Sequence, residues 1–176
     1  MNDIITRMLR AAKLDVSLYE EVEADQGAMG QAVLVVVLSS LAAGIGAMGT
    51  LGFGGIIVSI LTALIGWYIW AFLTYYIGSK FLPEAETQAD HGEMLRTLGF
   101  SSSPGVIRVL GLIPGLYGFV NFIAAVWMLV AMVIAVRQAL DYKSTVRAVI
   151  VCLIGFVIYM VVVMLLMMII GLPSML

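Results

Sequence analysis

Long stretches without a charged side chain are the feature of this sequence that most limits how it can fold. Its 9 basic and 11 acidic residues all fall within residues 2–25, 80–108 and 137–147. The charge-free tracts between and after them have 54, 28 and 29 residues and cover 26–79, 109–136 and 148–176. A charge at the centre of a bilayer costs a few kcal/mol, and about 20 apolar residues span its hydrocarbon core. The sequence therefore predicts an all-α, polytopic membrane protein.

The overall composition agrees with a single membrane domain over residues 1–176. Hydrophobic residues make up 62% of the chain and charged residues 11%, far from the roughly 25% charged residues of soluble domains. We expect a cytoplasmic segment over 1–26 and a helical membrane bundle over 27–176. The net charge of −2 gives no electrostatic reason to expect nucleic acid as a partner.

Helix boundaries follow from the glycines and prolines inside the tracts. We expect spanning helices over 28–48 and 56–77, joined by a glycine-rich turn that runs through Gly54 and Gly55, and a last helix over 146–170. The middle tract predicts a hairpin whose first arm runs from Pro104 to Ile113 or Phe119 and whose second arm ends at 140. A first arm that stops at Ile113 would cover only about 15 Å and would be re-entrant. The residues that mark this hairpin are Gly111, Pro114, Gly115 and Asn121.

Positive charge favours five membrane passes. With the hairpin, all nine Lys and Arg residues lie on one side of the membrane, whereas a single helix through the middle tract would divide them six to three. We therefore expect a cytoplasmic N-terminus and an external C-terminus. Arg108 and Arg137 are the charges that we expect to lie deepest in the membrane, and we expect both to reach an interface by snorkelling.

The N-terminal segment predicts two short helices. Apolar residues recur at helical spacing from Ile4 to Ala12, and the opposite face carries Arg7, Arg10 and Lys13. This basic amphipathic helix either lies on anionic lipid or packs across the protein's own cytoplasmic face. Ser17 and Glu20 have the spacing of a capping box at the start of the second helix.

Sequence patterns typical of catalysis are not found. Residues 81–103 are expected to form a solvated loop, in which Asp90, His91 and Glu93 offer at most a weak metal-binding pattern. Ser39, Ser40, Ser59 and Thr62 lie in an apolar tract that contains no histidine or lysine. We therefore predict a protein that is not an enzyme and has no cofactor, no catalytic residue and no metal site.

Two segments resemble a known family. The run LYEEVEADQGAMGQA, which includes Leu18 and Tyr19, and the run GEMLRTLGFSSSPGVI are similar to those of the YIP family, the Ypt/Rab GTPase-interacting proteins, in its short bacterial form. Residues 99–104 resemble a loop of eukaryotic members, with Phe100 in place of a tyrosine. The resemblance implies a non-enzymatic, five-helix protein of a prokaryotic cytoplasmic membrane that organises or assembles membrane components.

Our first hypothesis is a membrane scaffold or adaptor in contact with the lipid bilayer. Its partners would be other membrane proteins or further copies of the chain, bound by a cytoplasmic face that includes Leu18, Tyr19, Arg96, Gly99, Phe100, Ser101 and Pro104. One alternative is a small transporter or channel that uses the interrupted hairpin. Another is an accessory subunit of a larger membrane complex.

Overall fold

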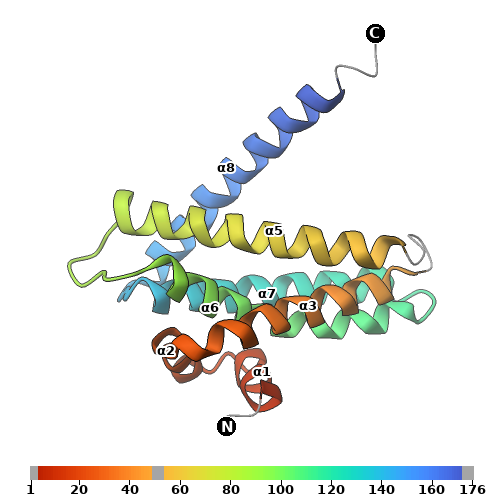
Figure 1. Cartoon of the computed structure of the whole chain (residues 1–176), viewed down its shortest axis with the longest axis horizontal. Helices are drawn as coiled ribbons and strands as arrows, with labels where there is room; N and C mark the ends of the chain where they lie inside the picture. Colours follow the sequence, from red (N-terminus) through yellow and green to blue (C-terminus); the bar gives the residue numbers. More distant parts are fainter. Residues whose placement is uncertain (1–3, 49–53, 172–176) are drawn as a thin grey trace.

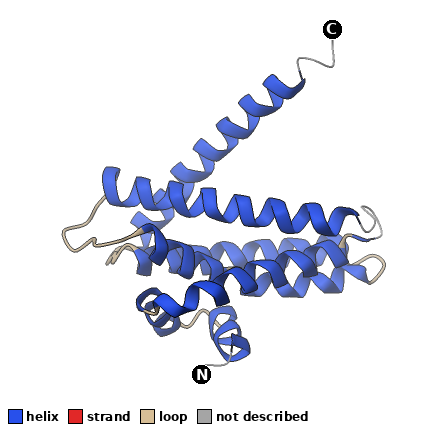
Figure 2. Cartoon of the chain, viewed as in Figure 1, coloured by secondary structure: helices blue, strands red, loops and turns tan. Residues whose placement is uncertain are grey.

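The computed structural model describes residues 4–48 and 54–171, and all regular secondary structure in these two ranges is helical (Figure 2). Four helical stretches in the described chain are long and apolar enough to cross a membrane: Gln26–Gly46, Gly54–Phe81, Tyr117–Ala139 and Thr145–Val162. The prediction of an all-α membrane protein is therefore confirmed. The fifth pass is not among these four stretches.

The long helices begin and end close to the predicted positions. Helix α3 covers Met29–Gly46 and follows the 3-10 turn η1, Gln26–Ala28. Helix α5 covers Gly54–Tyr76 and continues as the π-helical turn η2, Ile77–Phe81. Gly54 and Gly55 therefore begin a helix instead of belonging to the expected turn, whose residues 49–53 lie outside the described chain.

The two remaining long helices differ in how they pack. Helices α3, α5 and α7, Tyr117–Ala139, lie along one another, whereas α8, Thr145–Gly171, leaves the bundle at a steep angle (Figure 1). Near its start α8 buries Ala148, Val151 and Cys152 against the other helices. Farther along, side chains such as Phe156 and Met164 are exposed, as expected for a surface that faces lipid.

Residues 81–103 differ most from the prediction, because much of this segment is a buried helix and not a solvated loop. Helix α6, His91–Ser101, begins with a capping box in which Asp90 and Glu93 bond each other's backbone N–H groups. All residues from Met94 to Ser101 are buried. The helix forms because one face contacts α3 while other faces contact α2, α5 and α7.

The expected first arm of the hairpin is the 3-10 helix η3, Ser103–Leu112. It lies between α3 and α7, and the turn at 113–116 leads back into α7 (Figure 1). The tighter 3-10 coil rises about 2 Å per residue, so its ten residues extend about 20 Å. A re-entrant arm stays a prediction.

The N-terminal helices α1, Ile4–Ala12, and α2, Val16–Ala24, are docked against the bundle. The Trp127 indole Nε1 of α7 donates to the carbonyl of Ala12 at 2.7 Å, which fixes the end of α1. The cap of α2 is Asp15, whose carboxylate accepts from the Ser17 N–H, so the Ser17 capping box was a wrong prediction.

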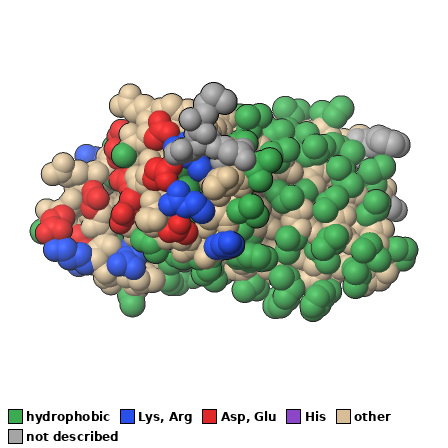
Figure 3. Space-filling view, turned by 90° about the horizontal axis from the view of Figure 1, so that it is seen from below, with side chains coloured by type: hydrophobic (Ala, Val, Ile, Leu, Met, Phe, Trp, Pro, Cys, Tyr) green, Lys and Arg blue, Asp and Glu red, His purple; other side chains and the backbone are tan. Residues whose placement is uncertain are grey.

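Charged side chains gather at one end of the molecule and apolar side chains cover the other (Figure 3). The main apolar core lies toward the charged end, where α2, α3, α6 and α7 meet, and includes the fully buried Tyr19, Met94, Phe100 and Leu140. Helix α5 exposes much of its apolar surface, including Ile57, Ile65 and Phe72. Such a surface is expected to be covered by lipid.

Candidate functional sites

The basic residues of α1 are engaged by acidic residues of the N-terminal segment. Arg7 is 4% exposed, and its Nη2 lies 2.8 Å from both Glu21 Oε1 and Asp25 Oδ2. Arg10 lies 2.8 Å from Asp15 Oδ2 and 2.6 Å from Glu21 Oε2. The Arg7 guanidinium lowers the pKa of Asp25, as expected for an opposite charge within hydrogen-bonding distance.

These ion pairs favour the alternative in which α1 packs on the protein itself. Lys13 is exposed at the end of α1, and Ile5 and Leu9 are 62% and 57% exposed on the face away from the bundle. Lipid contact at Arg7, Arg10 and Lys13 stays a prediction.

The predicted partner face is a packing centre in the structure. Leu18, Tyr19 and Phe100 have no exposed surface, and Arg96 is 6% exposed. The Arg96 guanidinium donates from Nε to the carbonyls of Val22, at 3.0 Å, and Glu23, at 3.1 Å, and from Nη2 to the Glu23 carbonyl as well.

The remaining residues of that face also pack inward. Gly99 lies so close to α3 that an added Cβ would sit 2.6 Å from the Cβ of Ala32, and Ser101 and Pro104 are buried. In this conformation these residues hold α2, α3 and α6 together. Partner contact at these residues stays a prediction.

A groove of about 500 Å³ opens at the charged end. Its walls are α2, the loop before α6, α6 itself and the connection from α7 to α8. The acidic lining residues are Glu20, Glu23, Glu86, Glu93 and Asp141, and the basic ones are Arg137 and Lys143. Burial, followed by the neighbouring carboxylates of Asp141, Glu93 and Glu20, raises the pKa of Glu23 to about 8. The sequence does not reveal this groove because its walls are far apart along the chain.

The weak metal pattern has a structural explanation. Asp90 and Glu93 are engaged in the α6 capping box, at 2.8 Å for each bond. The His91 ring lies 5.0 Å from the ring of Tyr68 and 5.9 Å from that of Phe72. Within residues 4–48 and 54–171, no group of three His, Cys, Asp or Glu side chains has metal-binding geometry.

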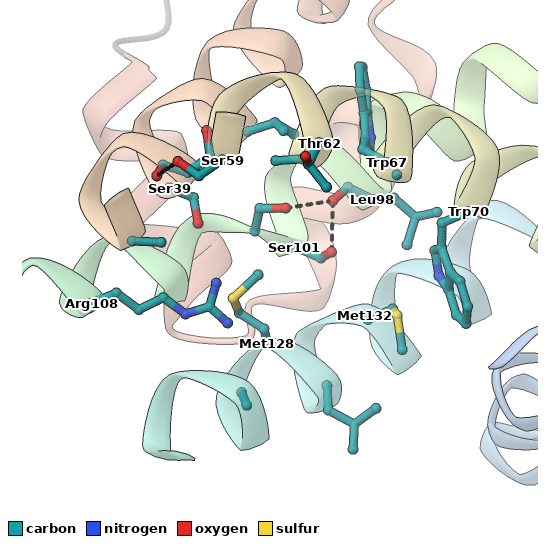
Figure 4. A pocket seen from close by; sticks show the side chains of 18 of the residues that line it. Ser39, Ser59, Thr62, Trp67, Trp70, Leu98, Ser101, Arg108, Met128 and Met132 are labelled. Atoms are coloured by element: carbon teal, nitrogen blue, oxygen red, sulfur yellow. Dashed lines mark hydrogen bonds between the residues drawn. The ribbon is translucent and has the colours of Figure 1, made fainter. Parts of the chain in front are cut away.

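A second cavity, of about 950 Å³, lies among the membrane helices. Figure 4 shows α5 along one side and α7 along the other, with Arg108 at one end and Trp70 at the other. Apolar side chains dominate the lining, and its hydroxyl groups come from Ser39, Ser40, Ser59, Thr62, Ser101, Ser102 and Tyr159. Among these, Ser40, Ser59 and Ser101 donate to backbone carbonyls of their own helices at 2.8–2.9 Å.

Arg108 is placed differently from the prediction. Its carbonyl lies against Gly46, at the end of α3 remote from the charged groove, where any side chain at Gly46 would collide with it. Its guanidinium points into the cavity (Figure 4), and the Nε is buried without a hydrogen-bond partner. Arg108 therefore lies away from the charged end, where its segment was expected. Snorkelling of its side chain to an interface stays a prediction. The sequence interpretation missed the site because it assigned this residue to a cytoplasmic segment.

The predicted hairpin residues serve the turn and its packing. Gly115 has a φ of +84°, a conformation that glycine adopts without strain, and Pro114 is exposed beside it. Gly111 is buried, and a Cβ there would lie 3.3 Å from the Gly46 carbonyl. The Asn121 amide donates to the Tyr117 carbonyl within α7 at 2.8 Å. None of these residues lines either of the two cavities described above.

Together, the apolar spans, the single charged end and the cavity inside the bundle define a polytopic α-helical membrane protein. The chain belongs to the YIP family, because the model of the Yip1 domain matches residues 17–166. The comparisons with curated proteins and with solved structures give no match.

Proposed function

We propose that this protein is a non-catalytic scaffold or adaptor of the cytoplasmic membrane that binds a membrane-associated protein through the acidic groove. The single observation that carries the proposal is the groove itself. Four segments bring carboxylates together at the charged end, and Glu20, Glu86 and Asp141 are exposed there. A lysine- or arginine-rich segment of a partner complements this charge.

The positions of the polar side chains support a role without catalysis. The lone histidine is enclosed by aromatic rings, and three of the cavity's serine hydroxyls are bonded to helix carbonyls. No base stands beside a nucleophile in these contacts, as covalent catalysis would need.

Five passes are part of the proposal. Helix α6 and η3 both pack along α7, and their 11 and 10 residues extend about 16 and 20 Å at the rises of the two helix types. Together these two lengths nearly equal the length of α7, whose 23 residues extend roughly 34 Å. The composite segment is therefore long enough to be the third pass. With this pass the groove and the N-terminus share one side of the membrane, and we propose that this side is the cytoplasm.

Site-specific photocrosslinking in cells tests the scaffold function. A benzoylphenylalanine at position 141, inside the groove, is expected to crosslink one defined protein in a fixed ratio. The double variant Glu20→Lys, Asp141→Lys, with the crosslinker at position 86, should lose that product because its charges repel a basic segment. Position 16 on α2, where Val16 is 40% exposed, gives the matched crosslinking control.

Thr145→Lys adds charge at an exposed position that does not line the groove, and it should keep the product. Equal crosslinking from positions 16 and 141, or a product that survives the double reversal, contradicts the scaffold proposal.

The membrane cavity favours transport as a second candidate function. A 3-10 segment with a cation lines the cavity, and interrupted helices line the substrate paths of many carriers. Uptake of chloride and of inorganic phosphate into reconstituted vesicles tests this. Uptake that Ala125→Trp abolishes and Val126→Trp preserves would establish transport, since Ala125 lines the cavity and Val126 does not. Vesicles no more permeable than protein-free ones would exclude both anions as substrates.

A further inference from the structure

The cavity between α5 and α7 contains two hydrogen-bond donors without an acceptor. The Arg108 Nε and the Trp70 Nε1 are both buried and bond to nothing in the described chain. Burying such donors costs free energy unless an acceptor reaches them. The described hydroxyls do not fulfil this role, although several of them line the same space.

The charge of Arg108 is also unbalanced. No carboxylate of the described residues lies within ion-pair distance of its guanidinium, in contrast to Arg7 and Arg10. An ionisable residue at membrane depth normally has a counter-charge, and a guanidinium forms paired hydrogen bonds with phosphate oxygens. The missing partner is therefore an anion that supplies several acceptor oxygens.

The mouth of the cavity indicates where this anion comes from. Lining residues on both long helices are exposed, among them Val58 and Thr62 on α5 and Ala125 and Leu129 on α7. Because both helices belong to the membrane-spanning set, the mouth between them faces lipid hydrocarbon. A free phosphate ion would have to cross that hydrocarbon, whereas a membrane lipid can enter sideways.

We propose that this cavity binds one anionic phospholipid, with its phosphate on Arg108 and its acyl chains along Met128, Leu129 and Met132. The volume of about 950 Å³ lies within the range of specific ligand pockets. The methionines provide an adaptable apolar wall for flexible chains. This proposal does not depend on the scaffold function, since the acidic groove and the cavity share no lining residue.

Native mass spectrometry of the full-length protein in neutral detergent tests the proposal. The protein is titrated with phosphatidylglycerol, which carries a net negative charge, and with phosphatidylcholine, which carries none. We expect one phosphatidylglycerol per chain, bound about tenfold more tightly than phosphatidylcholine, which corresponds to about 1.4 kcal/mol. Arg108→Gln should remove this preference, whereas Arg147→Gln, at an exposed position that does not line the cavity, should keep it.

A second pair of variants keeps the test decisive if Arg108→Gln does not fold. Ala125→Trp narrows the cavity and should weaken lipid retention about tenfold. The neighbouring Val126 does not line the cavity, so Val126→Trp should leave lipid retention unchanged. Inorganic phosphate and glycerol 3-phosphate, which have no acyl chains, should not displace the lipid.

Three results would overturn the proposal. The first is equal retention of the two lipids by the native chain. The second is retention that Ala125→Trp leaves unchanged. The third is displacement of the lipid by inorganic phosphate, which would make the cavity a site for soluble anions. The charge-reversed groove variants should retain the lipid as the native chain does. A failure of the scaffold proposal can therefore be distinguished from a failure of the lipid proposal.

Discussion

Two arginines of this chain show how differently the same side chain can be used. Arg96 satisfies two backbone carbonyls of α2 inside the protein, whereas Arg108 faces a cavity with no acceptor from the described chain. The difference is one of packing, because each arginine directly follows an apolar residue in the sequence, Leu95 or Ile107. Stability should therefore depend on Arg96, and lipid binding on Arg108.

Replacement of Arg96 by methionine keeps the apolar volume but leaves the carbonyls of Val22 and Glu23 without donors. We expect a loss of about 2–3 kcal/mol in the free energy of unfolding. The unfolding midpoint of the detergent-solubilised protein measures this loss. Lys143→Met is the control, because its ion pair with Glu86 is 75% and 63% exposed and should contribute nothing measurable. Equal midpoints for Arg96→Met and the native chain would contradict the structural role.

Glu23 should make the protein less stable as the pH rises. Its pKa of about 8 in the folded chain lies above the ordinary value of 4.5, so the folded state holds the proton more tightly. Stability therefore falls between pH 4.5 and 8, and the full destabilisation is present above pH 8. Glu23→Gln should raise the free energy of unfolding at pH 9 by about 1 kcal/mol, and it should leave that free energy unchanged near pH 4. The figure at pH 9 is kept small because the side chain is partly exposed to solvent.

Unfolding midpoints of the native and Glu23→Gln proteins across this pH range check the prediction. Glu86→Gln, at an exposed carboxylate of the same groove, should show no gain at pH 9. A Glu23→Gln gain that is the same at pH 4 and pH 9 would be inconsistent with titration of Glu23.

The packing of α6 depends on its close contact with α3 at Gly99. A Cβ at position 99 would lie 2.6 Å from the Ala32 Cβ and 3.0 Å from its Cα, so the two helices would have to separate. Gly99→Ala should lower the free energy of unfolding by about 1–3 kcal/mol, because the added methyl group overpacks this contact. Gly30→Ala is the matched control, since nothing lies within 4 Å of a Cβ there and alanine favours the helix by about 0.5–1 kcal/mol. Opposite shifts of the unfolding midpoint are expected, and two shifts of the same sign would refute the close contact.

The sequence predicts those elements that are apolar over their whole length. Both ends of α3, α5 and α8 and the C-terminal end of α7 lie within three residues of the predicted positions. Helix α6 was missed because Glu93 and Arg96 make it look like solvated sequence, although the spacing of Asp90 and Glu93 is that of a capping box. The 3-10 geometry of η3 has no such local signal, because it results from packing between α3 and α7.

Neither candidate site could be predicted from the sequence. The acidic groove and the membrane cavity each combine side chains from at least four segments, and no pattern within any one segment marks them. The charge-free tracts place the helices in a membrane but do not say which helices touch. For the same reason the residues predicted as a partner face, such as Tyr19 and Phe100, prove to be buried core.

The number of membrane passes decides where the groove and the cavity mouth lie, and cysteine labelling measures it. In a Cys152→Ala background, single cysteines are placed at the exposed positions 88, 117 and 143. If α6 and η3 cross the membrane, an impermeant maleimide should label position 117 in intact cells. Positions 88 and 143 should then react only after permeabilisation. If these segments do not cross the membrane, position 117 lies on the same side as position 88. Position 143 then lies on the opposite side. Labelling of 143 but not of 117 from outside would therefore exclude five passes, and the groove could no longer lie in one aqueous compartment.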